Sequence, residues 1–297
     1  MSISVVINTL NEEGSIKRAL ESLSWADEVV IIDDGSTDAT LEILRNTKMK
    51  DERVKIFHHK SGGYVEPARN FAISKASGDW ILILDADEEI PETLAVRLKN
   101  VTTEMQQINY VEIPRKNIIF GKWMKASMWW PDYQIRFFKK GVVTWRNEIH
   151  SKPGVTGEGI KLDDEERWAI VHHNYESVYQ FIERMNRYTK IQAEELNKSG
   201  GKFEWNDLIK KPLSEFLSRF FSNKGYKDGV HGLVLSLLQA LSFVVVFTKV
   251  WEMEKFKEAE LKIDEIKSLT KESGKEINYW LKEIDPPGNL FKRFFKN

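Results

Sequence analysis

Hydrophobic and polar positions follow two alternating patterns along the N-terminal part of the chain. Short apolar runs rich in β-branched residues predict buried strands, and the segments between them space apolar residues three or four apart, as helices do. The predicted strands are 3–7, 28–32, 54–58 and 80–84, and the predicted helices are 11–23, 39–45 and 67–75. This alternation predicts βαβ units, and therefore an α/β fold whose mostly parallel sheet is flanked by helices.

The segment DWILILDADEE, residues 79–89, runs an apolar strand directly into a cluster of carboxylates. Like charges this close together need compensation, which a divalent cation bound by Asp85 and Asp87 would provide. The alternative is a solvated acidic turn before a helix, with Glu88 and Glu89 in a first turn favoured by the helix dipole. The motif DDGSTD also follows a predicted strand, and open α/β sheets bind ligands beyond the carboxyl ends of their strands. We therefore expect both motifs in one crevice, which favours the cation.

Composition excludes several classes of protein. The 297 residues carry a net charge of −1, which argues against bulk electrostatic binding to nucleic acid. The absence of cysteine excludes disulfides and thiolate metal sites. The chain enters a strand pattern at its start, so we expect no signal peptide.

The C-terminal part differs in character from the rest. A long helix is predicted over 175–196, followed by the linker NKSGGK, so we expect one domain at 1–200 and an amphipathic helical extension at 201–297. Residues 232–248 carry no charge and would form a helix about 25 Å long. Such a helix is buried in a core, lies partly inserted in a membrane surface, or spans the membrane. Flanking lysines and the tail NLFKRFFKN favour contact with an anionic membrane surface.

Four segments carry a resemblance to a known family: SVVINTLNEE, VVIIDDGSTDAT, EPARNFAISKASGDWILILDADEE and ERMNRYTKIQAEEL. Together with KGYKDGVHGL they resemble family 2 glycosyltransferases of the GT-A fold, in the group that adds a sugar to lipopolysaccharide core or a similar lipid-linked glycan. The resemblance covers about residues 1–250. It implies an inverting, metal-dependent glycosyltransferase at the cytoplasmic face of the cell membrane. The donor would be a nucleotide sugar, and the acceptor a lipid-linked saccharide.

The resemblance also implies which residues hold the donor. Asp34 would bind the nucleotide base, although it could instead be a turn residue. Arg69 would meet a phosphate, with a surface salt bridge as the alternative, and Asp85 would reach the ribose or the waters of the ion. The first strand and its loop would wrap the base and ribose through Asn8, Leu10 and Glu12. Many relatives carry Pro and Tyr in place of Asn8 and Leu10.

The metal would be Mg²⁺ or Mn²⁺, since both prefer carboxylate and phosphate oxygens. By resemblance Asp87 is the ligand from the DXD motif. Relatives often supply a further ligand or phosphate contact from a histidine late in the catalytic domain, and IVHHNY offers His172, with His173 beside it.

Transfer to a hydroxyl also needs a general base. The group usually shows His-Glu where this chain has RNEIHSKP, so His150 matches but Ser151 replaces the glutamate. Glu148 is the substitute candidate, with Asp132 behind it.

Two alternatives stay open at this point. One is transfer to a polyprenyl phosphate, an acceptor that is already ionised and needs no base. The other is a nucleotide-binding scaffold without turnover, against which the intact DAD motif argues.

Overall fold

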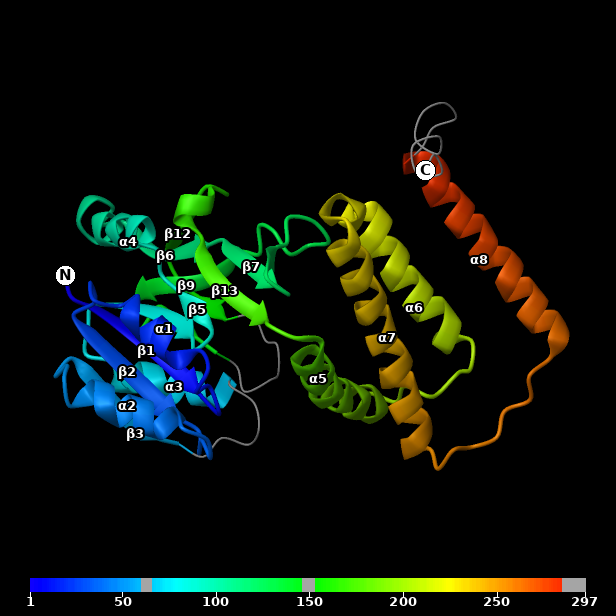
Figure 1. The fold of residues 1–297 in the computed structure, drawn as a ribbon, viewed down its shortest axis with the longest axis horizontal. Helices are drawn as coiled ribbons and strands as arrows, with labels where there is room; N and C mark the ends of the chain where they lie inside the picture. The colour runs from blue at the N-terminus through cyan, green and yellow to red at the C-terminus, as the bar shows by residue number, and fades with distance from the viewer. Residues whose placement is uncertain (60–65, 146–152, 285–297) are drawn as a thin grey trace. The chain divides into compact units, whose positions relative to one another are not determined.

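The computed structural model describes residues 1–59, 66–145 and 153–284. Its contacts divide the chain into two compact units. The first comprises residues 1–118 and 130–174, and the second comprises residues 119–129 and the chain from 175 onward. Figure 1 shows strands gathered with flanking helices in the first unit and long helices in the second. The domain boundary at residue 200 stays a prediction, although α5 (Val178–Lys198) belongs to the second unit by its contacts.

A seven-stranded sheet with the order β12-β6-β9-β4-β1-β2-β3 forms the centre of the first unit. Neighbouring strands from β4 to β3 are parallel, whereas β9 runs antiparallel to both β4 and β6. The predicted α/β class is therefore confirmed, with one strand reversed. The strands are β1 (Ile3–Thr9), β2 (Glu28–Asp33), β3 (Val54–His58), β4 (Trp80–Asp85), β6 (Ile108–Ile113), β9 (Gln134–Lys139) and β12 (Glu158–Lys161).

Helices cover both faces of this sheet because successive side chains of a strand point to opposite sides. On one face Ile3, Val5 and Ile7 join the cluster that includes Leu94 and Leu98 of α4. On the other face Val6 packs in the cluster that includes Ala72 of α3 and Ala76 just after it. The helices are α1 (Ile16–Glu21), α2 (Thr40–Lys48), α3 (Glu66–Lys75) and α4 (Glu92–Glu104).

The first helix is shorter than its sequence pattern predicts, at Ile16–Glu21 instead of 11–23. Asn11 adopts a left-handed backbone conformation with φ of 56°, which asparagine tolerates better than most residues but which an α-helix excludes. Its side-chain oxygen accepts a hydrogen bond from the Thr37 amide at 2.8 Å. This tertiary contact holds residues after β1 in a turn.

The acidic segment after β4 is neither solvated nor helical. Glu88 and Glu89 form the short strand β5, which pairs with β13 (Ile170–Tyr175) so that Glu88 lies opposite His172. Glu88 is fully buried and Asp87 is 9% exposed. The alternative of a solvated turn before a helix is therefore wrong, because β13 covers this segment. The remaining short elements of the first unit are β7 (Arg115–Ile119), β10 (Val143–Thr144), β11 (Gly154–Val155) and the 3-10 turn η1 (Glu166–Trp168).

Glu28 is a buried carboxylate near the amino end of β2. Its side chain accepts hydrogen bonds from the Ser4 hydroxyl, from the Ser77 amide at 2.7 Å and from the Lys55 ammonium at 2.5 Å. Burial by itself raises the pKa of Glu28, but these donors outweigh it and lower the pKa from 4.5 to about 2. The stabilisation is therefore present above pH 4.5 and is lost as the pH falls toward 2.

We expect Glu28→Gln to lower the free energy of unfolding by about 3 kcal/mol at neutral pH, since each pKa unit corresponds to roughly 1.4 kcal/mol. The difference from wild type should shrink as the pH falls below 4.5. Urea titrations at several pH values measure it, with the exposed Glu42→Gln as control. A difference that stays constant down to pH 3 would show that the charge of Glu28 is not its cause.

The second unit is helical. Asp228 is buried beside the loop 119–129, and its carboxylate accepts hydrogen bonds from the amides of Lys125 and Ala126 at 3.1 and 2.8 Å. Gly232 lies so close to Gly225 that a Cβ on it would meet the Gly225 carbonyl oxygen at 1.9 Å. The elements are β8 (Lys122–Trp123), α5, α6 (Asp207–Leu217), the π-helix η2 (Ser218–Ser222), η3 (Gly225–Asp228), α7 (Val230–Met253) and α8 (Ile263–Ile284).

Helix α7 is long and apolar enough to cross a membrane by length and composition, with a mean hydropathy of 2.2 over its best window. Only 33% of that window is buried within the structure. One face of α7 is buried and includes Leu235 and Val250. Within the second unit, α7 contacts α5 and α6. The other face exposes Val230, Leu233, Leu237 and Leu241. Burial in a core therefore accounts for only one side of this helix.

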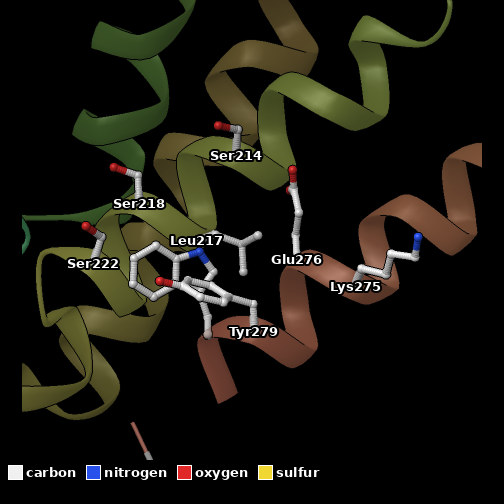
Figure 2. A pocket seen from close by; sticks show the side chains of 8 residues that line it. Ser214, Leu217, Ser218, Ser222, Lys275, Glu276 and Tyr279 are labelled. Carbon is white, nitrogen blue, oxygen red and sulfur yellow. The ribbon is translucent and has the colours of Figure 1, made fainter. Parts of the chain in front are cut away.

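A cavity of about 490 Å³ lies between α6, η2 and α8 (Figure 2). Leu217, Ser218, Tyr279 and Trp280 are among its lining residues. None of the predicted site residues lines it.

Candidate active site

The carboxyl ends of four neighbouring parallel strands bring the two acidic motifs to one edge of the sheet. Asp85 on β4 lies opposite Asn8 on β1, and the next residue of β1 lies opposite Asp33 on β2. Asp33 in turn lies opposite His58 on β3. The expected crevice edge is thus formed by the registers of these strands.

The turn after β2 is fixed by its first and last aspartates. The carboxylate of Asp33 accepts hydrogen bonds from the amides of Gly35 and Ser36 at 3.0 and 3.3 Å, and Asp38 accepts one from the Thr40 amide at 3.0 Å. Oδ1 of Asp34 lies 3.5 Å from Nδ1 of His59. The hydrogen bonds to Asp33 and Asp38 fix the turn. Binding of the nucleotide base by Asp34 stays a prediction.

The end of β1 carries two buried polar groups that pair with none of the described residues. Among the described residues, Nδ2 of Asn8 and Oγ1 of Thr9 are buried without a hydrogen-bond partner. Such groups cost free energy unless a ligand or water meets them. Leu10 is 43% exposed, and the carboxylate of Glu12 accepts a hydrogen bond from the Ser15 hydroxyl at 2.6 Å.

Three arginines surround Asp85. The sequence did not suggest this cluster. Arg136 donates to both carboxylate oxygens, Arg69 approaches Oδ1 at 3.3 Å, and Arg115 lies 4.0 Å from Oδ2. Burial alone raises the pKa of Asp85, but the charges of Arg136 and Arg69 outweigh it and hold the pKa well below its usual range. Asp85 is therefore ionised and held in place. The alternative of a salt bridge for Arg69 is realised here with Asp85.

The same cluster contains two further carboxylates, which balance the arginines in charge. Arg115 and Arg136 both reach Oε1 of the buried Glu88, at 3.2 and 3.3 Å. Arg115 also donates through Nε to Oδ2 of Asp132 at 2.9 Å. Three cations and three anions thus form one network. The sequence could have indicated a buried charge at Arg136, because this arginine is the single charge within the segment QIRFF. The residues around Arg115 give no such indication.

Asp87 and His172, which the resemblance suggests as metal-binding groups, face each other. Nε2 of His172 lies 3.5 Å from Oδ1 of Asp87, and both side chains are almost fully buried. They meet because β13 pairs with β5, directly after the DXD motif. On its other side the ring contacts Asn117, with 2.7 Å between Nδ1 and Oδ1.

These two residues fit a divalent cation as its protein ligands. Within the described residues there is no cluster of three or more His, Cys, Asp or Glu side chains suited to a metal. Mg²⁺ in nucleotide sites is commonly held by one or two carboxylates, with substrate phosphates and water completing the shell. A carboxylate and an imidazole that face each other match that pattern.

His173 has a different environment from its neighbour. Its Nε2 contacts the carboxylate of Glu89, which also pairs with Arg18 at 3.2 Å. This ion-pair group makes His173 the less suitable metal ligand of the two histidines.

The candidate general bases Glu148 and His150 lie outside the described residues, together with Ser151. Asp132 accepts hydrogen bonds from Arg115, from Asn117 at 3.2 Å and from Gln134 at 2.9 Å. Burial raises the pKa of Asp132, but the charge of Arg115 outweighs it and lowers the pKa overall. A carboxylate held in this way has little affinity for a proton, so Asp132 is a poor general base.

Comparisons with known proteins define the class. The family model described as glycosyl transferase family 2 matches residues 4–156, just over half of the chain. The chain belongs to this family and is a glycosyltransferase, with the α/β fold predicted for it. The scaffold alternative is thereby set aside.

Relatives match over most of the chain. An uncharacterized glycosyltransferase of Rickettsia typhi is 28% identical over 263 residues, covering 84% of this chain and 87% of the relative. The lipopolysaccharide core biosynthesis glycosyltransferase LpsC of Rhizobium meliloti is 22% identical over 257 residues, covering 86% and 94%.

Two solved structures show a weaker likeness. Residues 1–349 of Staphylococcus aureus TarS, in complex with UDP-GlcNAc, have a TM-score of 0.47 and 19% identity, covering 89% of this chain and 94% of that solved chain. The mannosyltransferase PcManGT of Pyrobaculum calidifontis, in complex with GDP-Man and Mn²⁺, has a TM-score of 0.46 and 15% identity, covering 96% and 88%. At these TM-scores the likenesses add nothing to the family assignment.

Proposed function

We propose that this glycosyltransferase moves a sugar from a nucleotide-sugar donor to a lipid-linked saccharide, with inversion and with a divalent cation, at the cytoplasmic face of a membrane. The observation that carries the proposal is the pairing of Asp87 with His172 at the carboxyl edge of the sheet, beside the ionised Asp85. The similarity to LpsC over 94% of its length supports a lipopolysaccharide-core-like acceptor. Inversion rests on the family resemblance.

Different residues at the sheet edge would bind different parts of the donor. The unpaired amide of Asn8 suits the base or ribose, with Leu10, Glu12 and Asp34 around them. Asp85 is held by its arginines, which leaves Asp87 and His172 as the ligand pair. When bound, the cation would neutralise negative charge on the leaving diphosphate.

Arg69 is the arginine best placed to meet a phosphate. Its contact with Asp85 is 3.3 Å, and its side chain is 17% exposed, compared with 5% for Arg136. Arg136 is shared between Asp85 and Glu88, so moving it would leave two buried carboxylates short of a partner. Arg69 therefore can turn to a donor phosphate at the smaller cost.

A product assay tests the proposal. The purified protein receives UDP- and GDP-sugars with Mn²⁺ and one of two acceptors, a lipid-linked oligosaccharide or a polyprenyl phosphate. We expect sugar on a hydroxyl of the oligosaccharide. Glycosylation of the polyprenyl phosphate alone would overturn the acceptor assignment in favour of the alternative that needs no base, which Ser151 suggests.

The exposed apolar face of α7 supports contact with a membrane. Val230, Leu233, Leu237 and Leu241 recur at intervals of three or four residues, so they lie on one side of the helix. Transfer of an exposed leucine from water to an apolar phase yields about 1.5–3 kcal/mol.

Leu237→Glu combined with Leu241→Glu is expected to reduce binding to anionic vesicles by at least roughly tenfold, because it removes apolar area and adds repulsion. Cosedimentation with phosphatidylglycerol vesicles measures it. The control is Gln192→Glu with Asn197→Glu, which adds the same charge at exposed polar positions of α5. Equal losses in both double variants would mean that charge alone, and not the apolar face, controls binding.

A further inference from the structure

Asn117 on β7 is a fully buried polar residue to which neither the family match nor the sequence motifs give a role. Its side-chain amide lies between two site residues. Nδ2 is 3.2 Å from Oδ2 of Asp132, and Oδ1 is 2.7 Å from Nδ1 of His172.

The chemistry of Asp132 fixes which way this amide points. An ionised carboxylate only accepts hydrogen bonds, so the NH₂ group of Asn117 has to face Asp132. Arg115 and Gln134 hold the same carboxylate, and the lowered pKa of Asp132 keeps it ionised. The amide oxygen therefore faces His172.

The orientation of Asn117 in turn assigns a proton on the histidine. An amide oxygen only accepts, so Nδ1 of His172 has to carry the hydrogen. In the neutral ring Nε2 then carries a lone pair, and this lone pair points toward the carboxylate of Asp87 at 3.5 Å. Two acceptors face each other with no hydrogen between them, which is the arrangement that a cation resolves.

We propose that Asn117 is a positioning residue, anchored by Asp132, that holds His172 in the Nδ1–H tautomer and so presents Nε2 to a divalent cation shared with Asp87. The inference rests on the proposed metal dependence. It adds to the ligand pair a series of hydrogen-bonded side chains that runs from Arg115 through Asp132 and Asn117 to His172. Hydrogen-bond partners of this kind orient metal-binding histidines and strengthen their binding.

The tautomer is measured directly and without metal. Protein labelled with ¹⁵N-histidine is examined by NMR at a pH where the imidazoles are neutral, and His172→Gln identifies the resonances of His172 among the six histidines. We expect the Nδ1–H form in the wild type. In Asn117→Leu, which keeps a similar volume but accepts no hydrogen bond, we expect a mixture of tautomers. A wild-type ring protonated on Nε2 would overturn the inference.

Metal affinity is the second readout. Titration with Mn²⁺ alone, followed by the EPR signal of the free ion, should show binding about 10–100-fold weaker for Asn117→Leu than for wild type. Asn100→Leu on α4 is the matched control and should bind as wild type does. Asp132→Asn keeps the shape of the site but releases the orientation of Asn117, so a loss in the same direction is expected even where Asn117→Leu folds poorly.

The outcomes separate the two proposals. A wild type that binds no Mn²⁺, even in the presence of UDP or GDP, would refute the proposed metal dependence, and this inference with it. A wild type that binds Mn²⁺, with Asn117→Leu and Asp132→Asn unchanged in affinity and tautomer, would refute the role of Asn117 and leave the proposed function intact.

Discussion

Asp87→Ala should lower kcat by roughly a thousandfold or more and should abolish stabilisation of the protein by a nucleotide sugar with Mn²⁺. The carboxylate of Asp87 lies 3.5 Å from Nε2 of His172, so its loss leaves one protein ligand for the proposed cation. Metal stabilisation of developing charge is worth several kcal/mol, and about 4 kcal/mol corresponds to a thousandfold in rate. Turnover measures the first effect.

Thermal unfolding with and without Mn²⁺ measures the second effect. A ligand at a hundred times its dissociation constant adds roughly 2.7 kcal/mol to the free energy of unfolding. Glu89→Gln is the control from the same acidic segment, since Glu89 pairs with His173 and Arg18. If Glu89→Gln abolishes the Mn²⁺ effect as fully as Asp87→Ala does, the cation is held by the general charge of the segment and not by Asp87.

Arg136→Met is expected to lower the free energy of unfolding by about 3 kcal/mol or more, because removing one partner from a buried ion-pair network leaves charge without compensation. Arg136 is 4% exposed and contacts both Asp85 and the fully buried Glu88. Urea unfolding measures the change. Arg167→Met removes an exposed ion pair with Glu165 and should change stability by less than about 1 kcal/mol.

A second substitution separates lost charge from lost packing. Glu88→Gln, introduced into Arg136→Met, removes one of the two carboxylates left behind and should restore part of the stability. Its single variant should destabilise the protein, because Arg115 and Arg136 then lose an anionic partner. If Glu88→Gln only adds to the destabilisation of Arg136→Met, the effect of Arg136 is packing and not electrostatics.

Local pattern was sufficient for most elements of the first unit. The strands β1 to β4 fall within about two residues of their predicted positions, because apolar runs of this length are buried in any α/β sheet. The start of α1 was misjudged because Asn11 is held by Thr37, a residue distant in the sequence. No bounds were predicted for α4 or α8, although α8 lies within the predicted helical extension at 201–297.

Local sequence likewise indicated some residues of the candidate site and not others. Asp85 and Asp87 stood out as carboxylates directly after an apolar strand, a feature of a single short segment. Arg115, Asn117 and Arg136 lie on β7 and β9, and nothing in their neighbouring residues shows which carboxylate they meet. Glu148 and His150 stay predictions from the sequence.

The sequence by itself determined the α/β class, the family and the position of the acidic motifs at strand ends, because each depends on residues close together in the chain. Only the tertiary structure decided that Glu88 is buried, that Asp85 lies within an arginine cluster and that His172 faces Asp87. His172 reaches Asp87 because β13 pairs with β5 across more than eighty residues of chain. Pairing of distant segments depends on the free energy of the whole fold, which no local pattern contains.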